Sequence, residues 1–234
     1  MITSSSKSKA VIVVQLHWHT EPLLLILFGL VAIIYGLAAG PLRHRLTLRV
    51  GRPWSQVFCF MLGLFILYGA MASPLDALGE HYLFSAHMLQ HVILIYPVPM
   101  LLLLGLPAWM LRPLMTRLGI ASLVRFLTRP VVALMTFNLV FIAWHIPGLY
   151  EWALRDRLMH NLEHVTFLLT ALLMWWPVLS PMPILPRLAW GSQMVYLFAL
   201  SISQIPVFAY ITFTREVLYP TYEIAARIVP KWVA

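Results

Sequence analysis

The chain has 234 residues, of which 61% are hydrophobic and 10% are charged, whereas about 25% of the residues of soluble domains are charged. This composition argues against a soluble enzyme, and the mean hydropathy of +0.85 indicates that the net charge of +8 reflects membrane topology and not nucleic-acid binding. The single cysteine, Cys59, excludes an intramolecular disulfide and a Cys-x-x-Cys motif, so a metal site would depend on histidine.

Six stretches are apolar and long enough to cross a bilayer, whose core of about 30 Å needs about 20 residues of helix. They cover residues 22–40, 54–73, 82–104, 130–147, 158–180 and 192–214. Residues 107–129 are too charged to span but carry Leu, Trp and Met at helical spacing, which predicts a helix on the membrane surface. The predicted fold class is all-α, a polytopic transmembrane helical bundle of about six spans with one interfacial helix.

We expect three parts: an N-terminal segment over residues 1–21, a transmembrane domain over 22–214 and a C-terminal segment over 215–234. No secretory cleavage signal is evident before the first span, so that span is expected to remain as an anchor. The loops after the first, third and fifth spans carry arginines and no acidic residue, whereas all eight Asp and Glu residues lie on the other side. The arginine side is therefore predicted to be cytoplasmic, with the N-terminus outward.

Eight of the nine histidines lie on the predicted outward side, and five of these lie within or close to a span. His87 and His91 in the third span, and His160 and His164 in the fifth, are spaced by four residues, which places both rings of a pair on one helix face. His145, near the outer end of the fourth span, comes to a similar depth. A single such histidine is often a hydrogen-bond partner, but five at one level predict a shared metal or cofactor site.

Several other side chains are candidates for accessory roles. Glu163 could orient a ligating imidazole or bind the metal directly, or it could be a helix-entry glutamate at the interface. The remaining candidates lie near the outward ends of spans or before them: Met71, Met88, Met159, His81, His17 and His19. Thioether sulfur would favour Cu(I), although methionine is also a common packing residue. The three histidines could form an entry relay.

Two prolines interrupt the third span just beyond His91. Pro97 and Pro99 lack the backbone N–H that a helix uses at these positions, which predicts a kink. The kink could open space beneath the histidines, or it could be a structural feature that a membrane helix tolerates.

Two segments carry a distinctive order of residues. The first contains Phe84-Ser-Ala-His87-Met88-Leu-Gln90-His91, followed by Tyr96-Pro97-Val-Pro99 and Leu104-Gly105-Leu-Pro107. The second contains Trp144-His145-Ile-Pro147-Gly-Leu-Tyr150, followed by His160-x-x-Glu163-His164-x-x-Phe167 and Trp175-Trp176-Pro177. They closely resemble the CtaG family of integral-membrane assembly factors of the caa-type cytochrome c oxidase group. This family is distinct from the single-span Cox-eleven-like proteins that share its name. The likeness includes Ser73-Pro74-Leu75-Asp76 and covers most of the chain from about His17-Trp18.

The resemblance implies a bacterial plasma-membrane protein that matures a haem-copper oxidase by handling copper of undetermined redox state. Our leading hypothesis is a metallochaperone, not an enzyme, that accepts copper on the outward side and passes it to an oxidase subunit. The implied ligands are the motif histidines His87, His91, His145, His160 and His164. The implied partners are a haem-copper oxidase subunit and the lipid bilayer, with a soluble copper donor as a further candidate. Family members usually have seven spans, whereas this chain stops at Ala234, so either the sequence is truncated before a last helix or this member lacks it.

Two further hypotheses remain open on the residues alone. One histidine from the third span and one from the fifth could ligate a b-type haem, although haem needs two imidazoles and five lie at one level. Alternatively, His160-Asn161-Leu162-Glu163-His164 matches the inverted zincin pattern, in which two histidines bind zinc and the glutamate is the general base. This pattern would make the chain an intramembrane zinc hydrolase.

Overall fold

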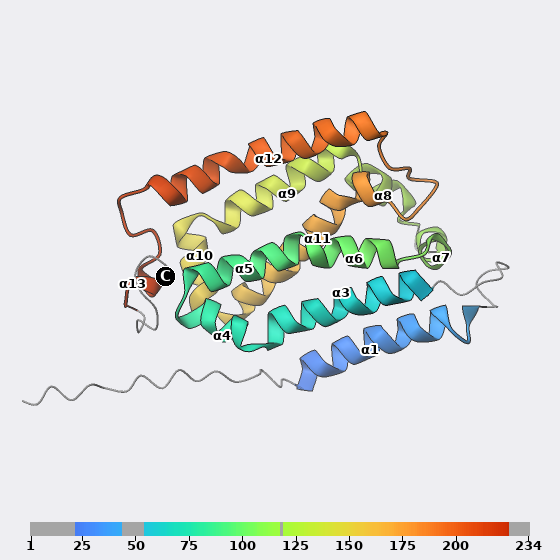
Figure 1. The fold of residues 1–234 in the computed structure, drawn as a ribbon, viewed down its shortest axis with the longest axis horizontal. Helices are drawn as coiled ribbons and strands as arrows, with labels where there is room; N and C mark the ends of the chain where they lie inside the picture. The colour runs from blue at the N-terminus through green and yellow to red at the C-terminus, as the bar shows by residue number, and fades with distance from the viewer. Residues whose placement is uncertain (1–21, 44–53, 118, 225–234) are drawn as a thin grey trace, which may run out of the picture.

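A computed structural model describes residues 22–43, 54–117 and 119–224, and within these ranges it contains helices and no β-strand (Figure 1). The helices are α1 (Pro22–Ala39), α3 (Trp54–Ala72), α4 (Pro74–His81), α5 (Phe84–Ile95), α6 (Pro97–Gly105), α7 (Ala108–Arg117), α8 (Ala121–Leu127), α9 (Pro130–Trp144), α10 (Pro147–Arg155), α11 (Arg157–Leu179), α12 (Trp190–Phe213) and α13 (Pro220–Ile224). The predicted all-α class is confirmed. The N-terminal segment expected over residues 1–21 lies outside the described residues.

Four of the described helical segments are long and apolar enough to cross a membrane: α3, α5 with α6, α11 and α12. A fifth candidate combines α8 with α9, which meet at a bend of 73°. Helix α1 contributes a shorter apolar stretch, Leu24–Ala39. Each predicted span therefore coincides with one helix or, for the third span, with the two consecutive helices α5 and α6. The helical bundle with several candidate spans is confirmed, whereas the number of six spans stays a prediction.

The predicted interfacial segment is helical, but it is divided into two helices where the sequence pattern predicted one. Gly119, between α7 and α8, has a φ of +64°. This left-handed conformation is readily adopted by glycine and commonly follows the last turn of a helix. The break was missed because the spacing of apolar residues continues through the glycine.

The third predicted span is interrupted at Tyr96, between α5 and α6, next to the prolines at which a kink was expected, and the two helices together remain one candidate span. In a continuous helix the carbonyl of Ile95 would accept from the backbone nitrogen of Pro99, which has no hydrogen to donate. The indole Nε1 of Trp175, on α11, donates to this carbonyl oxygen over 2.8 Å instead. A buried side chain thus replaces the hydrogen bond that the proline removes.

Helix α11 is the central element of the bundle, since it contacts α5, α6, α9 and α10. Its residues Phe167 and Met174 pack with Phe137 and Phe141 of α9 in the main apolar cluster. Helices α1 and α12 lie on opposite sides of the bundle and expose large apolar side chains, as expected for surfaces that face lipid (Figure 1).

The short helices gather at the two ends of the bundle. Helices α4, α10 and α13 lie at one end, which we call the α4/α10 end, and α7 and α8 lie at the other (Figure 1). Helices α5 and α11 both begin at the α4/α10 end and contact each other. Their first two turns, which carry the paired histidines, are therefore brought together.

Candidate metal centre

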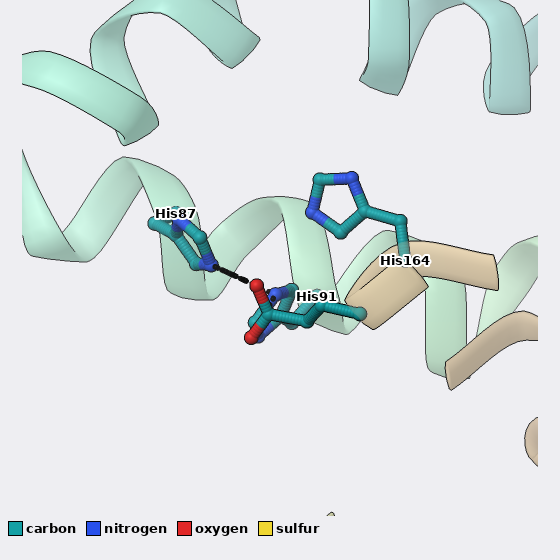
Figure 2. Close-up of side chains that lie close together, drawn as sticks. His87, His91 and His164 are labelled. Carbon is teal, nitrogen blue, oxygen red and sulfur yellow. Dashed lines mark hydrogen bonds and ion pairs between the residues drawn. The ribbon is translucent and has the colours of Figure 1, made fainter. Parts of the chain in front are cut away.

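Four histidines from α5 and α11 meet at the α4/α10 end, and all four are buried. His87 and His91 lie one turn apart on α5 with ring centroids 4.3 Å apart, and His160 and His164 lie one turn apart on α11 with ring centroids 4.2 Å apart. The centroid of His164 is 5.5 Å from that of His91. Figure 2 shows the rings of His87 and His91 extending from one helix and that of His164 from another. The spacing of the histidines in the sequence correctly predicted both pairs.

One set of possible ligands, the inner group, joins the two helices and consists of His87, His91, Glu163 and His164. One nitrogen or oxygen atom from each lies within 4.8 Å of every other. The Nε2 atoms of His87 and His91 are 2.8 Å apart, and the Glu163 oxygens lie 3.6 Å and 3.5 Å from them. Two ligands of a tetrahedral ion bound at about 2.0–2.1 Å are about 3.3 Å apart. The inner group therefore has nearly the dimensions that an ion requires.

Several buried atoms of the inner group have no hydrogen-bond partner. They are both oxygens of Glu163, both nitrogens of His164, and Nδ1 of His87 and of His91. A buried polar atom without a partner costs about 1–3 kcal/mol, so each such atom requires an explanation. A cation among these side chains would give the carboxylate and imidazole atoms that face it a partner. The three imidazoles and one carboxylate thus fit a metal by their chemistry as well as by their distances.

A second set of possible ligands, the outer group, consists of Asp76, His160 and His164. Asp76 comes from α4, and its Oδ1 lies 3.5 Å from Nε2 of His160. The side chains of Asp76 and His160 are 12% and 5% exposed, whereas those of His87 and Glu163 are fully buried. His164 belongs to both groups and so connects them.

Local structure at the start of α4 brings Asp76 to this position. Ser73 caps the helix by accepting a 3.2 Å hydrogen bond from the backbone N–H of Leu75, and Pro74 occupies the first turn, where a missing N–H costs nothing. One turn later Gly79 lies against the backbone of α5 at His87. The sequence Ser-Pro-Leu-Asp therefore forms a capped helix start that places a carboxylate beside α5 and α11.

Gln90 of α5 holds Asp76 in place. Its Nε2 donates to Oδ1 of Asp76 over 2.6 Å and to the carbonyl oxygen of Ala70 over 2.9 Å. Burial alone raises the pKa of Asp76, but hydrogen bonds from His160 and Gln90 outweigh it and bring this pKa below its usual value. Asp76 is therefore a carboxylate at neutral pH, as a metal ligand must be.

Asp76 and Gln90 were not predicted as site residues. From the sequence, Asp76 was only one of the acidic residues on the outward side. Its contact with α11 could not be predicted, because that contact depends on how α4 folds back on α5. A signal for Gln90 was available, since a polar side chain inside a membrane span is costly and commonly functional.

His145 lies beside the inner group but is in neither set. Its ring centroid is 6.3 Å from that of His91, and its Nδ1 lies 2.7 Å from the carbonyl oxygen of Phe141, at the C-terminal end of α9. Its own carbonyl oxygen accepts a 3.1 Å hydrogen bond from the Tyr219 hydroxyl. The structure thus places His145 in the wall of the site.

The predicted accessory residues are dispersed. Three methionines are packed in or beside apolar clusters: Met71, Met88 and Met159. The side chain of His81 is 60% exposed at the end of α4. His17 and His19 lie outside the described residues. Glu163, by contrast, lies at the centre of the cluster.

Aromatic residues close the α4/α10 end over the histidines. Tyr150 of α10 is fully buried with its ring centroid 5.1 Å from that of His87, and the ring of Tyr219 lies 4.1 Å from that of Tyr150. The Tyr222 hydroxyl donates to the carbonyl oxygen of Gly79 over 2.6 Å. Burial raises the pKa of Tyr150 well above its ordinary value, so its hydroxyl stays protonated. These contacts limit the access of water to the cluster.

Comparison with protein families identifies a match over most of the chain. The family described as cytochrome c oxidase caa3 assembly factor (Caa3_CtaG) matches residues 33–234, a range that includes both ligand groups. No curated protein and no solved structure shows significant similarity. The chain belongs to the Caa3_CtaG family of cytochrome c oxidase caa3 assembly factors.

Proposed function

We propose that this chain is a copper chaperone, not an enzyme, that binds copper through the buried histidine cluster and delivers it to a subunit of a haem-copper oxidase. The observation that carries the proposal is the inner group. Its three imidazoles and one carboxylate converge from two helices, and they include buried atoms that no hydrogen bond satisfies. In a family of oxidase assembly factors, such a donor set is best explained by a metal that the oxidase needs.

The donor types favour copper among the metals that assembly could require. Imidazole ligands suit zinc, copper, iron and nickel, and a given nitrogen and oxygen site binds Cu²⁺ most tightly of the divalent first-row ions. Both ligand groups contain one carboxylate, which supplies a negative charge at a buried cation site. A buried cation without such a charge would be strongly destabilised.

The location of the cluster suits delivery within a membrane. The ligands lie in the first two turns of α5 and α11 and, for Asp76, on α4, at the end of the bundle opposite to α7 and α8 (Figure 1). The distribution of arginine between the loops supports an outward, periplasmic position for this end in the bacterial plasma membrane. A soluble donor could then load the site from outside, while an oxidase helix docks within the bilayer.

The same contacts weigh against the two alternative hypotheses. A bis-histidine haem would need room for a flat porphyrin ring between its two axial imidazoles, but here the Glu163 carboxylate lies among the imidazoles of the inner group. In a hydrolase Glu163 would act on water as a base. Its oxygens instead lie 3.6 Å and 3.5 Å from the nitrogens of His87 and His91, as expected of a ligand.

The test is the metal content of the client oxidase. In cells that lack this chain, the oxidase would be purified after complementation with the wild type, with His164→Ala, or with Asn161→Ala, an exposed neighbour on α11. We expect oxidase that contains haem but lacks copper with His164→Ala, and normal copper with Asn161→Ala. Membranes would be probed to show equal amounts of each variant. Full copper in the oxidase matured with His164→Ala would refute the proposal.

A further inference from the structure

The two ligand groups overlap at one residue, and this overlap constrains how copper can occupy the cluster. His164 belongs to both the inner and the outer group. It is 1% exposed, and neither of its ring nitrogens has a hydrogen-bond partner. Other buried imidazoles at the site are fixed by at least one polar contact, such as that between His160 and Asp76. His164 is therefore free of hydrogen bonds that would prevent it from ligating an ion in either group.

A neutral imidazole has one nitrogen with a free lone pair, since its other nitrogen carries the proton. His164 can therefore bind one ion at a time. The cluster as a whole contains two carboxylates, Asp76 and Glu163, whose combined charge balances a single Cu²⁺ ion. A second divalent ion would leave two uncompensated positive charges in a buried site. Both arguments favour one ion that changes ligands over two ions bound together.

We propose that copper passes through two successive positions in this chain, an entry site formed by the outer group and a holding site formed by the inner group, with His164 as the ligand common to both. This inference rests on the proposed function. In the transfer the bonds from copper to Asp76 and His160 break, and bonds to His87, His91 and Glu163 form. The ion keeps its oxidation state, and it is paired with one carboxylate before and after the move.

The exposure of the ligands gives the direction of the path. The side chains of Asp76 and His160 retain 12% and 5% exposure, whereas those of His87 and Glu163 retain none. Gln90 links the two positions, because it lies on α5 between His87 and His91 and donates to Asp76 over 2.6 Å. An ion that reaches the cluster beside Asp76 therefore meets a positioned carboxylate before it reaches His87 and Glu163.

The experiment separates the rate of copper capture from the affinity of binding. Detergent-purified protein is mixed rapidly with Cu²⁺, capture is followed by the quenching of tryptophan fluorescence, and affinity is measured by competition with a chelator. The variants are Asp76→Asn at the entry site and Glu163→Gln at the holding site. Glu80→Gln makes the same charge change on the same helix as Asp76→Asn and serves as the matched control.

We expect Asp76→Asn to slow capture about tenfold while it changes the equilibrium affinity less than about threefold. Glu163→Gln is expected to capture copper at the wild-type rate and to bind it at least about tenfold more weakly. Asp76→Glu, which retains the carboxylate, should recover most of the capture rate. This conservative variant distinguishes the loss of a ligand from a folding defect.

Two results would overturn the two-site path. One is an Asp76→Asn variant that captures copper as fast as the wild type and Glu80→Gln. The other is a wild-type chain that holds two copper ions at once. In either case copper binding by the chain would remain, and only the path would be wrong. A well-folded wild type that binds no copper would instead refute the proposed function itself.

Discussion

Gly79 of α4 lies directly against His87 of α5, so that a Cβ added to Gly79 would be 2.9 Å from the Cα of His87 and 3.0 Å from its backbone nitrogen. The contact is between backbones, and no change of rotamer could relieve a larger side chain there. Helix α4 carries Asp76, and α5 carries His87 and His91. This glycine therefore sets the distance between the carboxylate of the outer group and the imidazoles of the inner group.

Gly79→Ala is expected to lower the stability of the bundle, because α4 must move away from α5. Overpacking typically costs about 1–3 kcal/mol, and the better helix propensity of alanine recovers at most about 1 kcal/mol of this. The matched control is Gly69→Ala on α3, where an added Cβ meets nothing within 4 Å and should be neutral or stabilising. Thermal unfolding in detergent would compare the two. Equal melting temperatures of the two variants would show that the close approach of α4 to α5 at Gly79 does not limit the stability of the bundle.

Trp175→Phe is expected to destabilise the bundle by about 1–3 kcal/mol, since it leaves the carbonyl of Ile95 without a donor. Pro99 cannot supply that donor, and the 2.8 Å hydrogen bond from the indole is lost while most of the ring volume is kept. Trp190→Phe, at a position that is 75% exposed, should have little effect. Melting curves of the two variants would test this, and a Trp175→Phe variant as stable as the wild type would contradict the role given to the indole.

Gln90→Met is expected to slow copper capture and to lower stability. The substitution keeps the length of the side chain but removes the hydrogen bond that positions Asp76 and the one to the carbonyl of Ala70, for which Pro74 has no N–H to offer. Because Gln90 acts through the carboxylate of the entry site, capture should slow by up to about tenfold, as in Asp76→Asn, while the equilibrium affinity changes less than about threefold. Leu89→Met, at the exposed neighbouring position, is the control. Rapid mixing of both proteins with Cu²⁺ would test this, and an unchanged capture rate in Gln90→Met would remove Gln90 from the site.

Copper itself is expected to stabilise the protein, and the cluster should be necessary for this effect. A ligand that binds only the folded state adds about 2.7 kcal/mol at one hundred times its dissociation constant. The melting temperature of the wild type should therefore rise with added copper and fall back when a chelator removes it. In His91→Ala the shift should be much smaller. A shift of the same size in His91→Ala would place the copper elsewhere.

The histidine pairs could be predicted from the sequence because their geometry is local. A spacing of four residues places His87 and His91, or His160 and His164, on one face of a helix wherever the helices lie. The two pairs can meet only if α5 and α11 begin at the same end of the bundle. This follows from the alternating direction of successive spans across the membrane. The all-α class followed equally directly, from stretches of apolar residues long enough to cross a bilayer.

The features that were missed depend on tertiary packing. Asp76 reaches His160 only because Gly79 allows α4 to lie on α5, and hydrophobic periodicity contains no information on such a contact. The division of the interfacial segment at Gly119 depends on a single backbone conformation. The contact of His145 with the carbonyl oxygen of Phe141 likewise depends on the way α9 ends, and the role of His145 as a ligand stays a prediction.

The most direct test of the central claim is the copper content of the detergent-purified chain after loading and desalting, measured beside a variant with His87, His91 and His164 all changed to Ala. We predict one copper ion per chain in the wild type and none in the variant, with both proteins helical and monodisperse. A folded wild type that retains no copper, or a variant that retains as much as the wild type, would contradict the assignment of the buried cluster as the copper site.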